Sequence, residues 1–152
     1  MSPSCPISTR RVDANMARMI SSQVALFAAL FLFTQINLFL FIIIFDFIVR
    51  AFRKSELSLF SMSAKIILSV LGAAPRPCDE SPKRFALYLG LGTALAALGL
   101  FSTGFVAAAA VIAVILLSCA LLEALFDFCI GCRIYYAIQL TKAKFSNDRN
   151  FN

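Results

Sequence analysis

The sequence Phe-Asp-Phe-Cys-Ile-Gly-Cys-Arg, at residues 126–133, closes the last and longest apolar run of this 152-residue chain. It contains the only Cys-x-x-Cys pair, formed by Cys129 and Cys132. An earlier segment at residues 45–50, Phe-Asp-Phe-Ile-Val-Arg, starts in the same way and also follows an apolar run. The two halves therefore resemble weak repeats, each an apolar block that ends in Phe-Asp-Phe and then an Arg.

The composition predicts an integral membrane protein. Hydrophobic residues make up 61% of the chain and charged residues only 14%, whereas a soluble domain averages roughly 45–50% apolar and about 25% charged residues. Long runs such as residues 38–45 and 106–122 contain no charge. We therefore expect the chain to be embedded in a lipid bilayer.

The basic residues give a formal net charge of +6, yet they do not predict a nucleic-acid partner. Lys and Arg cluster at the ends of the apolar runs, which is typical of positive-inside anchoring, and they form no basic stripe. The chain has no His. The absence of His excludes a Ser-His-Asp or Cys-His catalytic site within this chain.

The patterning predicts an all-α fold: a transmembrane bundle of four helices in two hairpins, with an amphipathic interfacial helix between the hairpins. A helix needs about 20 residues to cross the hydrocarbon core. The expected elements are a cytosolic tail at 1–15, spans at 16–34, 36–53, 83–101 and 105–136, the interfacial helix at 57–71, and a cytosolic tail at 141–152.

Two of these segments allow more than one interpretation. Residues 16–53 fit either one very long helix or a hairpin around the polar residues 34–37. We favour the hairpin, because it returns the basic segment 50–84 to the cytosolic side, together with both termini. The apolar face of residues 57–71 fits a helix lying in the membrane interface or one that packs on the bundle.

The Cys-x-x-Cys pair is the best candidate for chemistry. Cys129 lies 24 residues after Phe105, or about 36 Å along a regular helix, so we expect it near the cytosolic interface. A permanent disulfide is not expected in that reducing compartment. The pair is then a redox-active dithiol, part of a metal site, or two inert packing residues. On one continuous helix its place near the C-terminal end disfavours a thiolate, which Arg133 partly offsets.

The other cysteines widen the alternatives. Zinc or an iron–sulfur cluster needs about four ligands. Cys5 and Cys78 are also expected in the cytosol, so they are candidate co-ligands for Cys129 and Cys132; two chains of a homo-oligomer are the other source of four ligands. Cys78 is alternatively a resolving thiol or an incidental loop residue. Cys119 lies deep in its span, where we expect it to pack.

Charged residues also lie within or beside the apolar runs. Asp46 and Arg50 are four residues apart, so they are expected to form an ion pair along one helix. Glu123 and Asp127 share a helix face that is turned roughly 140–180° away from Cys132, which favours ion pairs with basic residues of neighbouring helices over a role beside the thiols. A proton or ion path is the alternative. The charged candidates are Asp46, Arg50, Glu123, Asp127 and Arg133.

Four sequence blocks carry a resemblance to a known family. They are Val-Asp-Ala-Asn at 12–15, Phe-Asp-Phe-Ile-Val-Arg-Ala-Phe at 45–52, Pro-Lys-Arg-Phe at 82–85 and Leu-Glu-Ala-Leu-Phe-Asp-Phe-Cys-Ile-Gly-Cys-Arg-Ile-Tyr at 122–135. The chain resembles small bacterial membrane proteins grouped as domain of unknown function 4395, over residues 12–140. Members commonly have Gly where this chain has Asp127, and often an acidic residue in place of Arg133.

The resemblance implies a multi-pass protein of the bacterial cytoplasmic membrane, and an association of some members with thioredoxin-like or sulfurtransferase proteins. We therefore expect a thiol or sulfur relay in which Cys129 or Cys132 exchanges with such a partner. The alternative is a non-enzymatic scaffold or assembly factor whose cysteines pack or bind zinc or iron. A small permease is disfavoured, because the spans lack a midplane polar cluster.

Overall fold

The computed structural model describes residues 11–52, 57–72 and 74–149, and in them the chain is all-α apart from two short strands. In chain order the elements are β1 (Arg11–Asp13), α1 (Ala14–Thr34), α2 (Asn37–Ala51), α3 (Leu59–Leu71), β2 (Pro77–Asp79), α4 (Glu80–Ser102), α5 (Val106–Phe126) and α6 (Ile130–Arg149).

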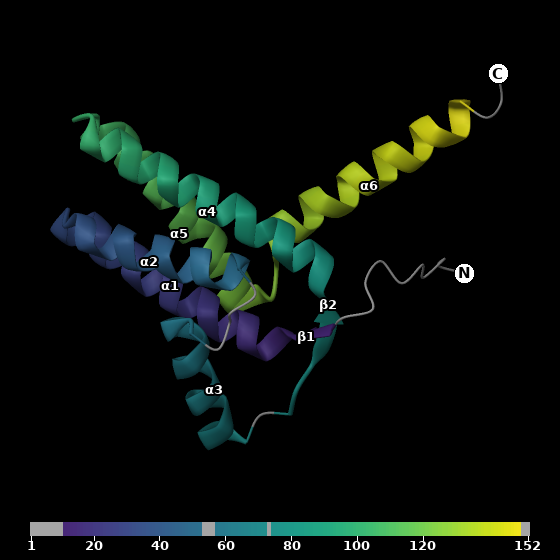
Figure 1. Cartoon of the computed structure of the whole chain (residues 1–152), viewed down its shortest axis with the longest axis horizontal. Coiled ribbons are helices and arrows are strands. Elements are labelled where there is room, and N and C mark those ends of the chain that lie inside the picture. Colours follow the sequence, from purple (N-terminus) through teal and green to yellow (C-terminus); the bar gives the residue numbers. More distant parts are fainter. Residues whose placement is uncertain (1–10, 53–56, 73, 150–152) are drawn as a thin grey trace.

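Helices α1, α2, α4 and α5 lie side by side as a bundle (Figure 1). The α1–α2 and α4–α5 turns lie at one end of this bundle, and strands β1 and β2 lie at the other (Figure 1). Helix α3 packs against α1 on the outside of the bundle, whereas α6 contacts mainly α4 and then projects away (Figure 1). The charged ends of the apolar runs are thereby gathered at one end of the molecule.

The sequence allowed two interpretations of residues 16–53, one long helix or a hairpin. The structure has two helices joined by a turn. Helix α1 ends at Gln35, whose backbone is left-handed (φ 55°) and whose N–H donates to the carbonyl of Phe31 at 2.7 Å. Helix α2 begins at Asn37 and runs back along α1. The polar residues in the middle of the apolar block therefore mark the turn.

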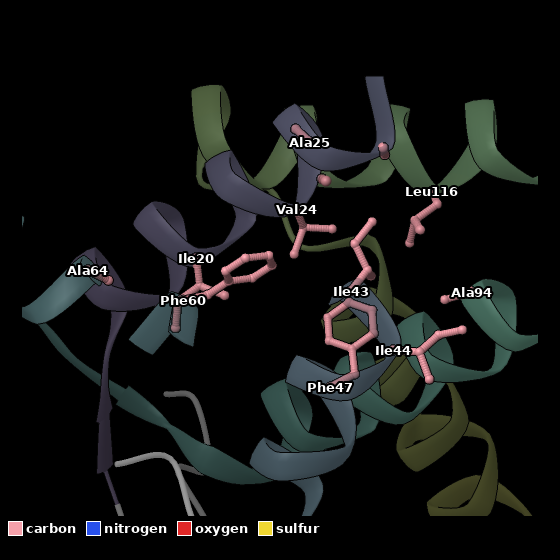
Figure 2. Packing of buried hydrophobic residues seen from close by; sticks show 12 residues of the cluster. Ile20, Val24, Ala25, Ile43, Ile44, Phe47, Phe60, Ala64, Ala94 and Leu116 are labelled. Carbon is pink, nitrogen blue, oxygen red and sulfur yellow. The ribbon is translucent and has the colours of Figure 1, made fainter. Parts of the chain in front are cut away.

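The core is built from small and branched apolar side chains that point inward from the bundle helices. Figure 2 shows Val24 from α1, Ile43 and Phe47 from α2, Ala94 from α4 and Leu116 from α5 converging in one cluster. Alanines at the contacts let the helices approach closely, as is common where helices pack in membranes. The buried alanines of the bundle are Ala25, Ala28, Ala94, Ala97, Ala109, Ala113 and Ala120.

Within the described part of the chain, three helices are long and apolar enough to cross a membrane: α1, α4 and α5. In the most apolar window of α4 only 11% of the residues are buried inside the protein, so most of its apolar surface faces outward, as a lipid-embedded helix requires. Helix α2 has 15 residues, or about 22 Å of length. It is therefore shorter than the span expected at 36–53.

The expectation of one helix over residues 105–136 is wrong. Helix α5 ends at Phe126, and α6 begins only at Ile130. Between them Asp127 takes a left-handed backbone (φ 54°), which stops the helix. Helix α6 also continues to Arg149, so most of the expected tail at 141–152 is helical.

Residues assigned to an N-terminal tail and a loop instead pair as a small antiparallel ribbon. Val12 of β1 lies opposite Cys78 of β2. Asp13 fixes the junction with α1, because its Oδ1 accepts from the N–H of Asn15 and from that of Arg76, both at 3.0 Å. Expectations for residues 1–10, including Cys5, lie outside the described residues.

Helix α3 is apolar on both its inner and outer faces. Phe60 and Ala64 are buried against the bundle, while Ile66 and Val70 are exposed. The packing of α3 on the bundle is therefore observed. The exposed apolar side chains of its outer face are the ones that would contact a membrane interface.

Candidate functional site

The candidate site is formed where the chain breaks between α5 and α6. The guanidinium of Arg18, on α1, donates from Nε and Nη2 to the carbonyl of Ala124 at 3.2 and 3.1 Å. The N–H of Asp127 donates to the carbonyl of Glu123 at 3.1 Å. These bonds satisfy carbonyls that the last turn of a helix leaves free, so the break is held by the first helix of the bundle.

Cys129 directly precedes α6 and acts as its N-terminal cap. Its Sγ accepts a hydrogen bond from the N–H of Cys132 at 3.4 Å, and its carbonyl accepts from the N–H of Arg133 at 3.2 Å. The pair was expected near the C-terminal end of a long helix, where a thiolate is disfavoured. The structure corrects this, because the pair lies in the first turn of α6, where the helix dipole favours negative charge.

The two thiols are electrostatically unequal. A hydrogen bond from the side chain of Cys132 lowers the pKa of Cys129, against the opposing effects of burial and of Glu123. The same hydrogen bond, together with burial, raises the pKa of Cys132. Lys83 favours the thiolate at both positions. The surroundings therefore favour a thiolate on Cys129 over a thiolate on Cys132.

Cys129 opens into a cavity of about 670 Å³ between the bundle helices and the start of α6, and Cys132 is not among its lining residues. The walls are mainly apolar, with polar side chains among them. The polar and sulfur-containing lining residues are Ser21, Arg50, Ser61, Glu80, Lys83, Arg84, Thr93, Cys119, Glu123 and Cys129, with Met16 at the same wall.

Gly131 sets the distance between α6 and α4. A Cβ on Gly131 would lie 2.6 Å from the Cβ of Ala86 and 2.7 Å from its Cα. No side chain fits in that space, so the Cys-x-x-Cys segment requires a small residue between its cysteines. This close approach fixes the first turn of α6 beside the cavity.

Asp46 and Arg50 form the predicted ion pair, with Arg50 Nε 2.8 Å from Asp46 Oδ2. Asp46 is buried, and its other oxygen accepts from the hydroxyl of Ser58 and from the N–H of Phe60 at 3.2 Å. The Ser58 hydroxyl in turn accepts from the N–H of Ser61 at 3.1 Å as the cap of α3. The carboxylate thus ties α2 to the start of α3, which the sequence analysis did not foresee.

The prediction that Glu123 and Asp127 share a face turned away from the thiols is wrong, because the helix ends between them. Glu123 lines the cavity and acts electrostatically on Arg50 and on both cysteines. Asp127 is exposed in the left-handed turn. Glu123, unlike Asp127, is thus a neighbour of the Cys pair.

The remaining candidates lie away from the cavity. Arg133 is exposed outside the three span-length helices, with its guanidinium 5.0 Å from the ring centre of Phe128. Cys78 donates its thiol to the carbonyl of Val12 at 3.1 Å, within the ribbon. In the described part of the chain no three Cys, Asp or Glu residues are grouped so that they could hold a metal ion. Cys129 and Cys132 alone supply two of about four ligands.

Several lining residues were not singled out for chemistry from the sequence, among them Cys119 and Lys83. Cys119 was assigned to packing, but it lines the cavity and is electrostatically coupled to Cys129. Lys83 was noted only as a basic residue within the Pro-Lys-Arg-Phe block. Lys83 lies at the start of an apolar helix and in one of the four blocks that carry the family resemblance, and this was the signal that could have marked it as a site residue.

Comparison with known proteins gives one match. Residues 12–139 match the family described as Domain of unknown function (DUF4395). No curated protein matches the chain, and no solved structure matches it. The matched region runs from β1 into α6 and includes both Cys129 and Cys132. It confirms the resemblance noted from the sequence, and the chain belongs to the DUF4395 family.

Proposed function

We propose that this protein is a membrane-embedded thiol–disulfide relay in which Cys129 attacks and Cys132 resolves. The observation that carries the proposal is the position of the pair. Cys129 caps α6, accepts a hydrogen bond from Cys132 and lines the cavity. A thiol at a helix N-terminus with a neighbouring thiol as hydrogen-bond donor is a typical nucleophile in disulfide exchange.

The exchange step uses only the two cysteines and a partner. The Cys129 thiolate attacks one sulfur of the partner's disulfide and forms a mixed disulfide, and the other partner sulfur leaves as a thiolate that takes up a proton. Cys132 then loses its proton and attacks the Cys129 sulfur. The partner leaves with two thiols, and Cys129 and Cys132 are joined. A thioredoxin-like protein fits this chemistry. A sulfurtransferase that carries a persulfide is the other candidate: the Cys129 thiolate attacks the outer sulfur, the sulfur–sulfur bond of the donor breaks, the donor thiolate leaves, and Cys129 carries the persulfide.

The relay is proposed to face the cytosol from a bacterial cytoplasmic membrane, with both termini inside. Two features support this orientation. The turns at 35–36 and 103–105 contain no charge, and they lie at the end of the bundle opposite the basic residues around the cavity (Figure 1). With α2 inserted beside α1 as a short fourth span, the bundle forms two hairpins.

Trapping of mixed disulfides tests the relay. Cys132→Ser removes the resolving thiol, so a partner is expected to accumulate as an adduct on Cys129 in cells. Cys129→Ser is expected to give no adduct, and Cys119→Ser and Cys78→Ser in the Cys132→Ser background are expected to leave it unchanged. Equal adducts from Cys129→Ser and Cys132→Ser, or none from either, would contradict the assigned roles.

A second candidate function is a non-enzymatic membrane scaffold or assembly factor. The observation that favours it is that Cys129 caps α6 while Gly131 packs against Ala86, so the segment also has a structural role. In this case Cys129→Ser, which can still cap a helix, should preserve both fold and cellular function. Zinc or iron bound in stoichiometric amounts to purified protein, and lost in that variant, would favour the metal-binding form.

A further inference from the structure

The cavity beside Cys129 contains two buried hydrogen-bond donors that lack an acceptor. Ser61 is fully buried, and its Oγ has no hydrogen-bond partner in the described structure. The same holds for Nη2 of Arg50, although its Nε faces Asp46. Both residues line the cavity. Buried polar groups are normally satisfied, so these two point to a ligand that accepts hydrogen bonds.

The charges around the cavity balance, which favours a neutral ligand. Arg50 is paired with Asp46, and Arg84 lies 3.9 Å from Glu80. The remaining lining charges, Lys83 and Glu123, have opposite signs. An anion such as thiosulfate or a phosphate would find no excess of positive charge, and it would occupy only a small part of about 670 Å³.

Part of the cavity is lined by residues that also belong to the apolar outer surface of the protein. Three of its lining residues, Leu89 on α4, Ile115 on α5 and Ile134 on α6, are exposed by 43%, 52% and 40%. In a bilayer such residues face hydrocarbon or its boundary. These features favour a ligand that enters from the lipid phase, with an apolar body against the walls and acceptor oxygens toward Arg50 and Ser61.

We propose that this cavity binds a lipid-soluble quinone, which takes electrons from the Cys129–Cys132 dithiol. A quinone is neutral, apolar, and carries ring carbonyl oxygens that accept hydrogen bonds. The inference rests on the proposed thiol relay, with the exchange running in reverse so that a partner dithiol reduces the Cys129–Cys132 disulfide, and it names the electron acceptor for that direction. Cys129, which lines the cavity, is the thiol that reaches the ring.

The reaction balances without a further reagent. The Cys129 thiolate adds to a ring carbon of the quinone, and Cys132, after losing its proton, attacks the Cys129 sulfur. The sulfur–sulfur bond forms as the carbon–sulfur bond breaks, and its electron pair stays with the ring. The two protons released by the thiols end on the two quinone oxygens. The products are one disulfide and one hydroquinone, and a partner dithiol then regenerates the thiols by exchange.

Decylubiquinone added anaerobically to the reduced full-length protein in lipid nanodiscs tests the proposal. We expect binding with one ligand per chain, loss of two thiols and formation of one hydroquinone. Cys129→Ser should bind decylubiquinone and form no hydroquinone. Ser61→Ala should weaken binding about fivefold to tenfold, as expected for one lost hydrogen bond, and exposed Ser69→Ala on the same helix should not.

A filled cavity gives an independent variant. Ala120 is buried and lines the cavity, so Ala120→Leu should weaken decylubiquinone binding about tenfold or more. Ala96→Leu, on the exposed side of α4, is the matched control. Thermal unfolding of both variants in nanodiscs, compared with that of the wild-type protein, checks that they are folded.

The outcomes separate the two proposals. Exchange with thioredoxin but no binding of decylubiquinone would overturn the quinone site and leave the relay standing. Binding without thiol loss would overturn the electron transfer. A tightly held phospholipid that decylubiquinone fails to displace would assign the cavity to a lipid and also overturn the quinone site. If the folded wild-type protein neither exchanges disulfides with thioredoxin nor forms hydroquinone, both proposals are overturned.

Discussion

Asp127 is a single residue whose backbone decides where α5 ends and α6 begins. Its φ of 54° lies in the left-handed region, which costs an ordinary L-residue about 1–2 kcal/mol and a glycine almost nothing. Asp tolerates the conformation better than most residues.

Substitution of Asp127 should therefore change stability according to backbone freedom, not charge. Asp127→Gly is expected to maintain the free energy of unfolding or raise it by up to about 1 kcal/mol, and Asp127→Val to lower it by about 1–2 kcal/mol. Asp127→Asn is the control that removes the charge and should be nearly neutral. Thermal unfolding in detergent measures the series. A destabilised Asp127→Gly would show that the carboxylate, not the turn, matters.

The Cys129 thiol should titrate at a pKa below the ordinary cysteine value, because the side chain of Cys132 donates a hydrogen bond to its thiolate. Its rate of alkylation is expected to fall as pH drops through that lowered pKa, since the thiol is then protonated. Cys132, with a raised pKa, should stay unreactive until the solution is much more alkaline. Mass spectrometry of iodoacetamide-treated protein across pH distinguishes the two sites.

Removal of the donor supplies the control for this titration. Cys132→Ala should move the pKa of Cys129 upward, toward the ordinary value, while the helix N-terminus remains in place. An unchanged alkylation profile in Cys132→Ala would mean that the helix end alone activates Cys129.

At the scale of elements, the close packing of α6 on α4 depends on Gly131. A Cβ on Gly131 would overlap both the Cβ and the Cα of Ala86, so Gly131→Ala is expected to push the helices apart and cost about 1–3 kcal/mol. Gly92→Ala, where nothing lies within 4 Å, is the matched control and should not destabilise. Unfolding midpoints and the alkylation rate of Cys129 are the readouts.

Compensation on the facing helix checks the cause. Ala86→Gly combined with Gly131→Ala removes the side-chain overlap but not the contact with the Ala86 backbone, so it should restore stability only in part. Full stability in the single Gly131→Ala variant would show that α6 is free to shift.

The docking of α3 on the bundle depends on the buried carboxylate of Asp46. Its contribution to stability is measured by comparing the ion pairs Asp46–Arg50 and Glu80–Arg84, whose partners are each four residues apart. Asp46→Ala leaves Arg50 buried without its partner and should cost about 3–5 kcal/mol. Glu80→Ala breaks the longer, more exposed pair with Arg84 and should cost less than about 1 kcal/mol. Amide exchange should rise along α3 only in Asp46→Ala. A uniform rise across the bundle would contradict a local role for Asp46.

The elements show which parts of the fold the sequence could predict. Long apolar runs and a polar interruption at residues 34–37 predicted the helices and the first turn, since burial and turn chemistry are local. The break at Asp127 was missed because Asp is no strong helix breaker and the apolar pattern continues across it. The ribbon of β1 and β2 was missed because it joins residues 11–13 to 77–79, a pairing that no local pattern records.

Of the candidate site, the sequence predicted the two cysteines and the charged residues Arg50 and Glu123. The spacing of the cysteines made the pair visible, but the sign of the local electrostatics depends on which end of a helix they occupy. An unbroken helix placed them at a C-terminal end, and the structure places them at an N-terminal one. Ser61 and Cys119 come together with Cys129 through packing of three different helices, which no spacing within the sequence encodes.

For the whole molecule, the number of membrane crossings decides the side on which the thiols lie. The bundle places the start of α1 and the Cys129 end of α5 at the same end (Figure 1). Reporter fusions at the two termini are expected to give the same cytosolic signal, and a cysteine introduced at Gln35 in a cysteine-free chain should react with a periplasm-restricted reagent. Opposite signals from the two termini would mean that α2 does not cross with α1.

Helix α6 extends from the Cys129 junction as a long arm that is attached to the bundle near one end. It has 20 residues, about 30 Å of rod, and it contacts the rest of the protein mainly through its first turns on α4. A tilt of about ten degrees at this junction would swing the far tip by about 5 Å. A change in sulfur bonding at Cys129 that tilts α6 would therefore displace the far end of the helix much more than it displaces the cysteine.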